Sequence, residues 1–509
     1  MHGSEKSDCC VVAMKWANKD AQAEAEFMER RQQAEGNAGQ PRTRRTQSRE
    51  SVSLQLHRVR ERAKARGQER FTALLHHVTP SLLASAFSWL KRDAAVGVDG
   101  VTWHEYEVDQ ERRLADLHQR VHRGTYRARP SRRQYIPKAD GRQRPLGIAA
   151  LEDKIVQRAL VEVLNAIYEQ DFLGFSYGFR PGRGQHDALD ALAVAIGQEK
   201  VNWIVDADLA KFFDTVSHEW LLRFLEHRVG DERVLRLIRK WLKAGVIEDG
   251  VHLATEVGTP QGAVISPLLA NVYLHYVFDL WAQQWRQRHA RGSMIVVRYA
   301  DDIVLGFQHQ SEAEAFLVAL RTRLERFALT LHPEKTRLLM FGRYAQVQRD
   351  RAGLGRPETF DFLGFTHICG RDRRGEFQLR RHTRRDRMHA ALVAIKDGLR
   401  RRLHHSIPVQ GKWLGQVVGG YMAYHGVPTN FHRLDAFRHY AVDHWRKALK
   451  RRSQRDSTTW ERMTRLADAY IPRPRITHPW PNVRFRVTHP RWEPGALIAP
   501  AGICAGGAR

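Results

Sequence analysis

The sequence predicts an α+β protein with an antiparallel sheet, followed by a wholly helical region. Short apolar stretches typical of strands are mixed with long amphipathic helices, without the regular strand–helix–strand repeat of a parallel sheet. Beyond about residue 380 the strand patterns give way to basic amphipathic helices. We therefore expect a boundary near residue 375 between the sheet-containing part and the helical part.

The elements are expected in a definite order. Residues 1–66 are rich in Gln, Glu, Arg and Ser and are expected to form a disordered or charged helical leader. Two short helices follow over 71–93, with a start at Thr79-Pro80. Later come a hairpin and long helix over 131–172, a strand and helix over 201–229, a Gly/Pro loop and helix over 258–285, a hairpin over 293–307, a helix and strand over 312–342, and a strand over 359–369.

The charge balance points to a polyanionic partner. The 509 residues include 83 Lys and Arg against 56 Asp and Glu, a formal net charge of +27, and most of the excess is arginine. Arginine binds phosphate through a planar fork, so DNA or RNA is the expected partner. The alternative is that the charge serves only solubility.

Cysteines and hydropathy limit the class of protein further. Cys9, Cys10, Cys369 and Cys504 are too few and too scattered for a disulfide framework or a zinc site. No apolar run approaches the roughly 20 residues of a membrane span, and the N-terminus lacks a signal-peptide pattern. We expect a cytoplasmic protein associated with RNA or with the nucleoid, and no membrane partner.

Carboxylates gather at two strand patterns. In "IVDADLAKFFD", Asp206 and Asp208 point to one face of a strand, with Asp214 beyond it, and Asp301-Asp302 lies at the tip of the hairpin "IVVRYADDIVLGF". If the hairpin pairs with that strand, three or four acids meet and need divalent cations to offset their repulsion. An all-oxygen site favours Mg²⁺. The simpler alternative is a turn that Asp301 caps.

The order of motifs resembles that of reverse transcriptases, and most closely the bacterial group II intron-encoded reverse transcriptases, or maturases. "YADD" is similar to the active-site box and "DADLAKFFD" to the first catalytic-aspartate motif. The other similar blocks, in the family's order, are "IPKADGRQRPLGI", "SYGFRPGRGQHDAL", "GTPQGAVISPLLANVYL", "LTLHPEKT" and "FDFLGF". The resemblance implies a right-hand polymerase, with fingers and palm over 67–375, a helical thumb called maturase domain X over 376–470, and a basic irregular tail over 471–509.

The resemblance assigns the catalytic centre to Asp208, Asp301 and Asp302. These carboxylates and the backbone carbonyl of Leu209 would hold two Mg²⁺ ions, for which Mn²⁺ can substitute, while Asp206 is only a neighbour and Asp214 is not implied as a ligand. Two ions suit in-line nucleotidyl transfer, because they can stabilise the attacking and the leaving oxygen.

The resemblance also implies contacts to nucleotide and nucleic acid. The residues implied at the nucleotide are Lys138, Arg144, Phe213, Gln261 and Lys335, with Gly258 and Gly262 allowing close approach of the backbone. Alternatives stay open: Lys138 and Arg144 in a solvated hairpin, Phe213 in the core, and no role for Lys335. The segment Phe362, Leu363, Gly364 and Phe365 would hold the primer end.

The helical part joins basic and aromatic residues. Trp413, Tyr421, Tyr424, Tyr440 and Trp445 are interleaved with Arg, Lys and His, a pattern typical of nucleic-acid binding, although we expect Trp413 and Tyr421 in the core. Arg446, Lys447, Lys450, Arg451 and Arg452 are the candidate nucleic-acid-binding residues. The segment 478–495 is too polar for a core and is expected to dock on RNA.

The sequence therefore predicts an RNA-directed DNA polymerase of a group II intron. Its expected partners are the intron RNA, a template RNA with a DNA or RNA primer, target DNA and dNTPs; a dimer is not implied. We also expect help with splicing and mobility, without an HNH endonuclease domain. The alternatives are an RNA-binding splicing cofactor whose polymerase site is vestigial, and a domesticated reverse transcriptase used in antiviral defence.

Overall fold

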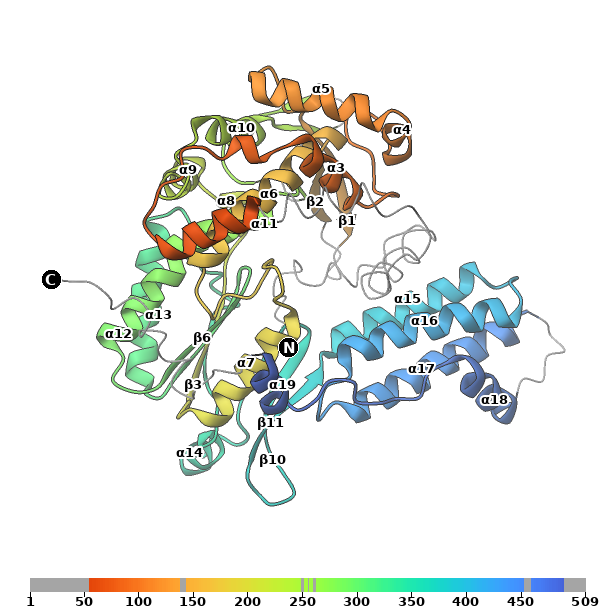
Figure 1. Ribbon diagram of the computed structural model, residues 1–509. Helices are drawn as coiled ribbons and strands as arrows, with labels where there is room; N and C mark the ends of the chain where they lie inside the picture. Colours follow the sequence, from red (N-terminus) through yellow and green to blue (C-terminus); the bar gives the residue numbers. More distant parts are fainter. Residues whose placement is uncertain are drawn as a thin grey trace.

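The computed structural model describes residues 55–137, 143–248, 251–254, 256–259, 262–452 and 459–488 (Figure 1). Its centre is a four-stranded, fully antiparallel sheet with the order β6-β7-β3-β8. The four strands are β3 (Trp203–Asp208), β6 (Met294–Tyr299), β7 (Asp302–Phe307) and β8 (Arg337–Met340). The hairpin predicted over 293–307 and the predicted α+β class are confirmed.

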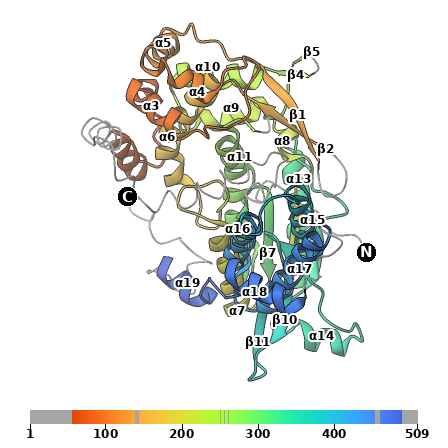
Figure 2. The same ribbon diagram turned by 90° about the vertical axis from the view of Figure 1, so that its right-hand side faces the viewer.

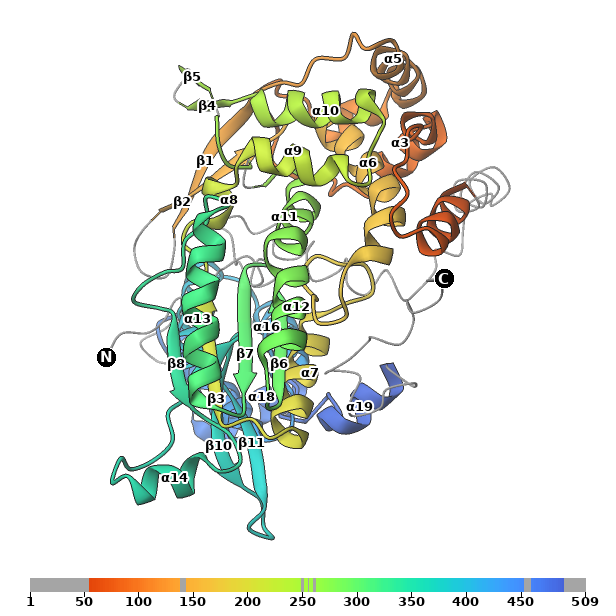
Figure 3. The ribbon, with the colours of Figure 1, turned by 90° about the vertical axis from the view of Figure 1, so that its left-hand side faces the viewer.

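Helices cover both faces of the central sheet. Along β7, Ile303 and Leu305 belong to one hydrophobic core, whereas Val304 between them belongs to another. Figure 3 shows α12 and α13 in front of one face, and α7 packs on the other. Because both faces are buried, the strands are continuous apolar runs rather than alternating patterns. The covering helices are α7 (Gln185–Gln198), α11 (Ser266–Leu274), the π-helical turn η4 (His275–Asp279), α12 (Leu280–His289) and α13 (Gln310–Glu325).

A second sheet lies in the N-terminal part, at the top of Figure 1. Its order is β2-β1-β4-β5, and β1 and β2 form the hairpin predicted before the long helix α6. Its strands are β1 (Ser131–Pro137), β2 (Gln143–Ile148), β4 (Val246–Glu248) and β5 (Val251–Leu253). The surrounding helices are one over 55–65, then η3 (Leu75–His77), α3 (Pro80–Ser88), α4 (Trp103–Glu107), α5 (Gln110–Arg123), α6 (Leu151–Asp171), α8 (Phe212–Thr215), α9 (His218–Glu226) and α10 (Glu232–Lys243).

A third sheet changes the expected boundary near residue 375. Its strands are β9 (Phe360–Phe362), β10 (Phe365–Arg371) and β11 (Phe377–Thr383) in the order β11-β10-β9, and α14 (Ala345–Arg351) precedes them. The single strand expected over 359–369 is thus a hairpin, turned at Leu363 and Gly364. β11 lies wholly beyond residue 375 and forms because β10 supplies its hydrogen-bonding partner, although its sequence contains adjacent arginines. The sheet-containing part therefore ends at Thr383 instead of near residue 375. Figure 2 shows β10, β11 and α14 at the end of the molecule opposite to β4 and β5.

The helical part begins at Arg385. It contains α15 (Arg385–Arg401), α16 (Ile407–His425), α17 (Phe431–Lys450) and α18 (Trp460–Tyr470) around a core of their own. Trp413 and Tyr421 are buried in this core, as expected. Trp445 is also fully buried and donates a 3.0 Å hydrogen bond to Oε1 of Gln410, so base stacking by Trp445 is excluded.

The segment after α18 returns to the sheet-containing part. The amides of Thr477 and His478 both donate to the carbonyl of Gly426, and α19 (Pro481–Thr488) packs against α7. Arg484 forms ion pairs of 2.7 and 2.9 Å with Asp187 and Asp190. The tail predicted as irregular is therefore helical over 481–488, because α7 offers acidic partners for its arginine; residues 489–509 lie outside the described part.

Among the described residues, no helix combines the length and the apolar character that crossing a bilayer requires.

Candidate active site

The predicted acidic residues meet at one end of the central sheet. In the antiparallel pairing of β3 with β7, Asp208 stands directly opposite Asp302. Cβ atoms of such opposed residues lie about 5 Å apart. Asp301 precedes Asp302 in the two-residue turn that joins β6 to β7. The exposed fractions of Asp208, Asp301 and Asp302 are only 5, 6 and 2%.

The loop before β8 borders this acidic group. Nζ of Lys335 lies 3.5 Å from Oδ2 of Asp208, and the amide of His332 donates to the Asp208 carbonyl at 2.8 Å. Asp206 lies two residues deeper in β3 and is fully buried, with Nη2 of Arg337 at 3.6 Å. Its contact with Arg337 of β8 supports the interpretation that Asp206 is a neighbour of the site and not a member.

The donors in this site suit a hard divalent cation. Three carboxylates and the neighbouring carbonyl of Leu209 offer only oxygen, the ligand that Mg²⁺ prefers. Like charges directly opposite in a sheet repel, so a cation is needed there. In the described side-chain positions no three His, Cys, Asp or Glu groups converge on a single point, and the Lys335 ammonium is the cation beside Asp208. The donor chemistry fits Mg²⁺.

The loop before α11 lies against α8 of the aspartate motif. The amide of Thr259 donates to the Phe213 carbonyl at 2.7 Å. Gly258 has a φ of +84°, and a Cβ there would lie 2.9 Å from the carbonyl oxygens of both Phe213 and Asp214. Glycine at position 258 therefore permits the close approach that the sequence predicts. Phe213 is itself 7% exposed and packs on Phe212. Most of its ring therefore belongs to the hydrophobic core, which is the alternative that the sequence left open.

Three of the residues predicted to contact the nucleotide have side chains outside the described part of the structure. Lys138 and Gln261 lie outside the described residues, and Arg144 is placed through its backbone, which pairs with Ile136 across the β1–β2 hairpin. Gly262 has a φ of +107°, and a Cβ there would lie 2.8 Å from the Gly147 carbonyl, which brings this loop against β2.

The predicted primer segment is a tight turn between β9 and β10. Phe362 and Phe365 are buried in the core that also contains Val427, so their side chains are structural. The hydroxyl of Tyr424, on α16, donates a 2.8 Å hydrogen bond to the Leu363 carbonyl. Any contact of this turn with a primer would therefore involve backbone atoms.

The predicted nucleic-acid-binding residues of α17 fall into two groups. Asp443 partly neutralises Arg446 and Lys447, at 3.1 and 2.6 Å, and the Arg446 guanidinium also lies over the Trp460 ring. The other three, Lys450, Arg451 and Arg452, are exposed at the C-terminal end of α17. Tyr440 on the same helix is half exposed and stays a candidate for base stacking.

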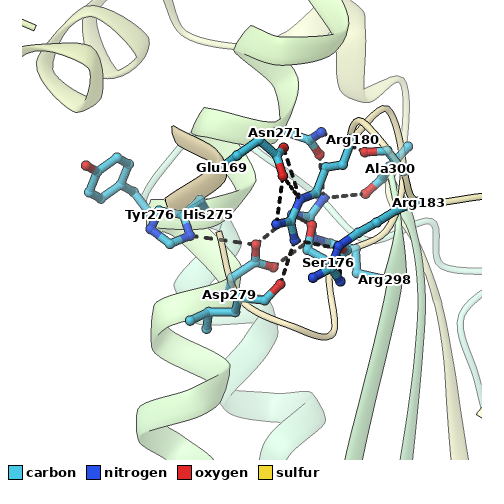
Figure 4. A network of polar contacts seen from close by, with 12 residues as sticks. Glu169, Ser176, Arg180, Arg183, Asn271, His275, Tyr276, Asp279, Arg298 and Ala300 are labelled. Atoms are coloured by element: carbon cyan, nitrogen blue, oxygen red, sulfur yellow. Dashed lines mark hydrogen bonds and ion pairs between the residues drawn. The ribbon is translucent and has the colours of Figure 1, made fainter. Parts of the chain in front are cut away.

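Sequence reasoning missed the residues that support the acidic turn. Arg298 lies in β6, is fully buried, and contacts Asp279, Asn271, Ser176 and the Ala300 carbonyl (Figure 4). A signal was present, because an arginine in the apolar run "IVVRY" requires a buried partner. The identity of that partner could not be derived from spacing.

Comparison with known proteins agrees with this geometry. A family model described as reverse transcriptase (RNA-dependent DNA polymerase) matches residues 136–367. Protein YkfC of Escherichia coli is 35% identical over 56% of this chain and 78% of its own length. The group II intron-encoded protein LtrA of Lactococcus lactis is 33% identical over 47% of this chain and 40% of its own length. Nuclear intron maturase 4 of Arabidopsis thaliana is 31% identical over 24% of this chain and 15% of its own length.

The paired strands with their opposed carboxylates and the matching family model define an RNA-directed DNA polymerase. Within that class, the chain belongs to the family of group II intron-encoded reverse transcriptases and maturases. It spans less than half the length of LtrA and about a seventh of the plant maturase.

Proposed function

We propose that this protein copies RNA into DNA at Asp208, Asp301 and Asp302, in a right-hand polymerase whose palm is the central sheet. The observation that carries the proposal is the register of β3 and β7, which sets Asp208 opposite Asp302 with Asp301 beside it. The β1–β2 hairpin and its helices would be the fingers, and α15–α18 the thumb. The three carboxylates and the Leu209 carbonyl would hold two Mg²⁺ ions, which supply charge stabilisation to the attacking 3′-oxygen and the leaving pyrophosphate.

The other residues of the site would bind and orient the substrates. Lys138 and Arg144 would neutralise the triphosphate, and Gln261 would contact the incoming nucleotide. The edge of Phe213 would face its sugar. Lys335 is close enough to Asp208 to act near the same phosphates. The β9–β10 turn would support the primer through its backbone.

Primer extension on an RNA template tests this proposal. Asp301→Asn and Asp302→Asn should each lower the rate of dNTP incorporation by at least about 10³-fold, because each removes a charged metal ligand. The matched control is Asp214→Asn, which changes the exposed carboxylate that ends the aspartate motif and is not implied as a metal ligand, so this variant should retain activity. Unchanged incorporation by the Asp301→Asn and Asp302→Asn variants would refute the proposal.

The second proposed activity is assistance to the splicing of a group II intron RNA. The names of LtrA and of the plant maturase, together with the +27 charge and the exposed cations at the end of α17, favour it. Added protein should lower the Mg²⁺ concentration at which its intron RNA splices. Charge reversal at Lys450, Arg451 and Arg452 should weaken that effect. An intron that splices equally well without protein at every Mg²⁺ concentration would contradict it.

A further inference from the structure

The catalytic turn rests on a buried arginine that uses all its hydrogen-bond donors. The guanidinium of Arg298 has five N–H groups, and the structure provides five acceptors. Nε and Nη2 donate to the two carboxylate oxygens of Asp279 at 2.7 and 2.6 Å. Nη2 also donates to Oγ of Ser176 at 2.6 Å, and Nη1 donates to Oδ1 of Asn271 at 3.0 Å. The fifth bond, from Nη1 to the carbonyl oxygen of Ala300 at 2.9 Å, reaches the turn itself.

We propose that Arg298 is a positioning residue for polymerisation, which holds the Ala300-Asp301 turn so that Asp301 and Asp302 are presented beside Asp208. The proposal rests on the proposed function of that acidic site. We call Arg298, Asp279, Asn271 and Ser176 the Arg298 network; Figure 4 shows its members converging on the guanidinium. Arg298 itself would contact neither substrate nor metal.

The turn needs external support because its backbone is strained. Ala300 has a φ of +57°, a region that costs a non-glycine residue about 1–2 kcal/mol. Such a conformation persists only where the surroundings hold it, and it is typical of functional sites. The bond from the fully buried Arg298 to the Ala300 carbonyl is a charge-assisted contact on that residue.

Residues 175–178 pack against Arg298 and Ala300 and form a second support of the turn. Arg298 exchanges backbone hydrogen bonds with Phe175 and Tyr177 at 2.9 and 2.8 Å. At Gly178 a Cβ would lie 2.2 Å from the amide nitrogen of Ala300, so only glycine allows this contact. Asn271 donates through Nδ2 to the Gly178 carbonyl at 2.7 Å and accepts from Arg298, so it joins both supports.

The π-helical turn η4 lets two residues of one continuous helical segment, Asn271 and Asp279, contact the same guanidinium. Asn271 lies in α11 and Asp279 ends the π-helical turn η4, eight positions later. Eight α-helical residues overshoot two full turns by about 80°, which would separate the two side chains. A π turn contains more residues and reduces that rotation, and such turns are frequent at functional sites. The irregular turn thus serves to aim Asp279 and Asn271 at one guanidinium.

Burial and geometry exclude lysine as an equivalent. Arg298 and Asp279 are both 0% exposed, so the pair is shielded from solvent and salt. An ammonium has three donors on a single nitrogen and cannot reach a carboxylate, an amide, a hydroxyl and a carbonyl in one plane. Arg298→Lys should therefore keep the charge but release the turn.

The control is a second buried arginine, Arg228, whose hydrogen-bond and ion-pair partners lie outside the Arg298 network. Nε of Arg228 lies 2.9 Å from Asp171, and its Nη1 donates to the carbonyls of Arg66 and Glu69 in the N-terminal part. It is also nearly fully buried, so Arg228→Lys should disturb packing and charge to a similar extent. It should do so without touching the acidic residues.

The experiment compares Arg298→Lys, Asn271→Ala and Arg228→Lys with the wild type. Thermal unfolding, the affinity for a template–primer duplex, single-nucleotide kcat, KM for dNTP and the Mg²⁺ concentration for half-maximal rate are measured below the unfolding range. Arg298→Lys should lower kcat about 10²-fold, as expected for a shift of about 1 Å in catalytic groups, and raise the Mg²⁺ requirement several-fold. Its template–primer affinity should change less than about threefold. Asn271→Ala should show the same pattern more weakly, and Arg228→Lys should lower thermal stability alone.

Two outcomes would overturn the positioning role. One is an Arg298→Lys variant with wild-type kcat and Mg²⁺ requirement. The other is a folded Arg298→Lys variant whose loss of kcat equals that of Arg228→Lys at the same thermal stability. Failure of the proposed function looks different, since the wild type would then extend no primer or Asp301→Asn would remain active.

Discussion

The two-residue turns of the β6–β7 and β9–β10 hairpins, both within the described residues, are stabilised in different ways. The β6–β7 turn has Ala300 at positive φ, and a buried arginine of its own strand donates to the Ala300 carbonyl. The β9–β10 turn has positive φ at both Leu363 and Gly364, and the Tyr424 hydroxyl of the helical part donates to the Leu363 carbonyl. In each turn one side chain donates to the carbonyl of the first central residue.

The difference lies in what each turn must hold. The β6–β7 turn carries Asp301 and is followed by Asp302, beside the third carboxylate of Asp208. It is held by the Arg298 network, in which a buried ion pair fixes the guanidinium that donates to the turn. The β9–β10 turn carries apolar residues, and its non-glycine residue at positive φ, Leu363, receives one neutral hydrogen bond from Tyr424 of α16. We infer that the side chains of the first turn serve the chemistry, whereas those of the second turn serve packing, and the Tyr424 hydrogen bond joins that turn to the helical part.

The largest expected effect is on the β6–β7 turn. Gly178→Ala places a methyl group 2.2 Å from the backbone nitrogen of Ala300, which cannot move without displacing the turn. We expect a loss of about 3 kcal/mol or more in the free energy of unfolding, with loss of primer extension. Chemical denaturation and single-nucleotide incorporation measure both.

Gly197→Ala is the matched control for that substitution. Gly197 lies inside α7 with open space around its Cα, and alanine is the better helix former by up to about 1 kcal/mol. It should leave activity unchanged and stability equal or higher. Equal behaviour of the two variants would contradict the tight packing at Gly178.

The next effect concerns pH at the junction near β9–β10. His425 is buried against Phe365, and burial lowers its pKa to about 3, with the charge of Arg387 acting in the same direction. Because its ordinary pKa is about 6.5, the unfolded chain binds a proton that the folded chain does not. Stability is therefore complete above pH 6.5 and falls as the pH drops, by about 2 kcal/mol per such histidine between pH 7 and 5.

Substitution of that histidine isolates its contribution. His425→Phe keeps a ring beside Phe365 and Tyr421 but removes the titrating group. The decrease in Tm between pH 7 and pH 5 should be smaller in the variant than in the wild type. The same decrease in both proteins would show that protonation of His425 does not lower the free energy of unfolding.

A smaller effect is expected at Gly364. Its φ of +80° lies in the region that disfavours side chains, while the nearest atom to a Cβ there, Cε1 of Tyr424, is 3.7 Å away. Gly364→Ala should therefore cost only the conformational strain of about 1–2 kcal/mol and leave kcat near the wild-type value. Denaturation and single-turnover incorporation test this. A large loss of kcat would mean that the turn contributes to chemistry directly.

The smallest effect should follow removal of one hydroxyl. Tyr424→Phe deletes the 2.8 Å hydrogen bond to the Leu363 carbonyl and should cost about 1 kcal/mol, seen as a Tm lower by about 1 °C. Single-nucleotide incorporation should stay within about twofold of the wild type, because only the junction is altered. A variant with unchanged Tm would show that water replaces the bond without loss.

Local patterns predicted the fold well where the signal was local. The apolar runs on both sides of Asp301-Asp302 predicted the β6–β7 hairpin, and the Asp-Gly signal at 140–141 predicted the β1–β2 hairpin. Predictions failed where tertiary partners override composition. β11 is a strand with adjacent arginines that exists because β10 pairs with it, and Trp445 is a core residue because Gln410 satisfies its indole nitrogen.

The sequence by itself determined the order of elements, the acidic residues and the class of enzyme, because these depend on residue type and spacing along the chain. Tertiary structure alone decided that Asp208 faces Asp302, and that Arg298 meets Asp279 from η4, Ser176 from a distant loop and the Ala300 carbonyl. The physical reason is that strand register and helix rotation set these contacts. Both result from packing across the whole core, and a shift of one residue would move every partner to another face.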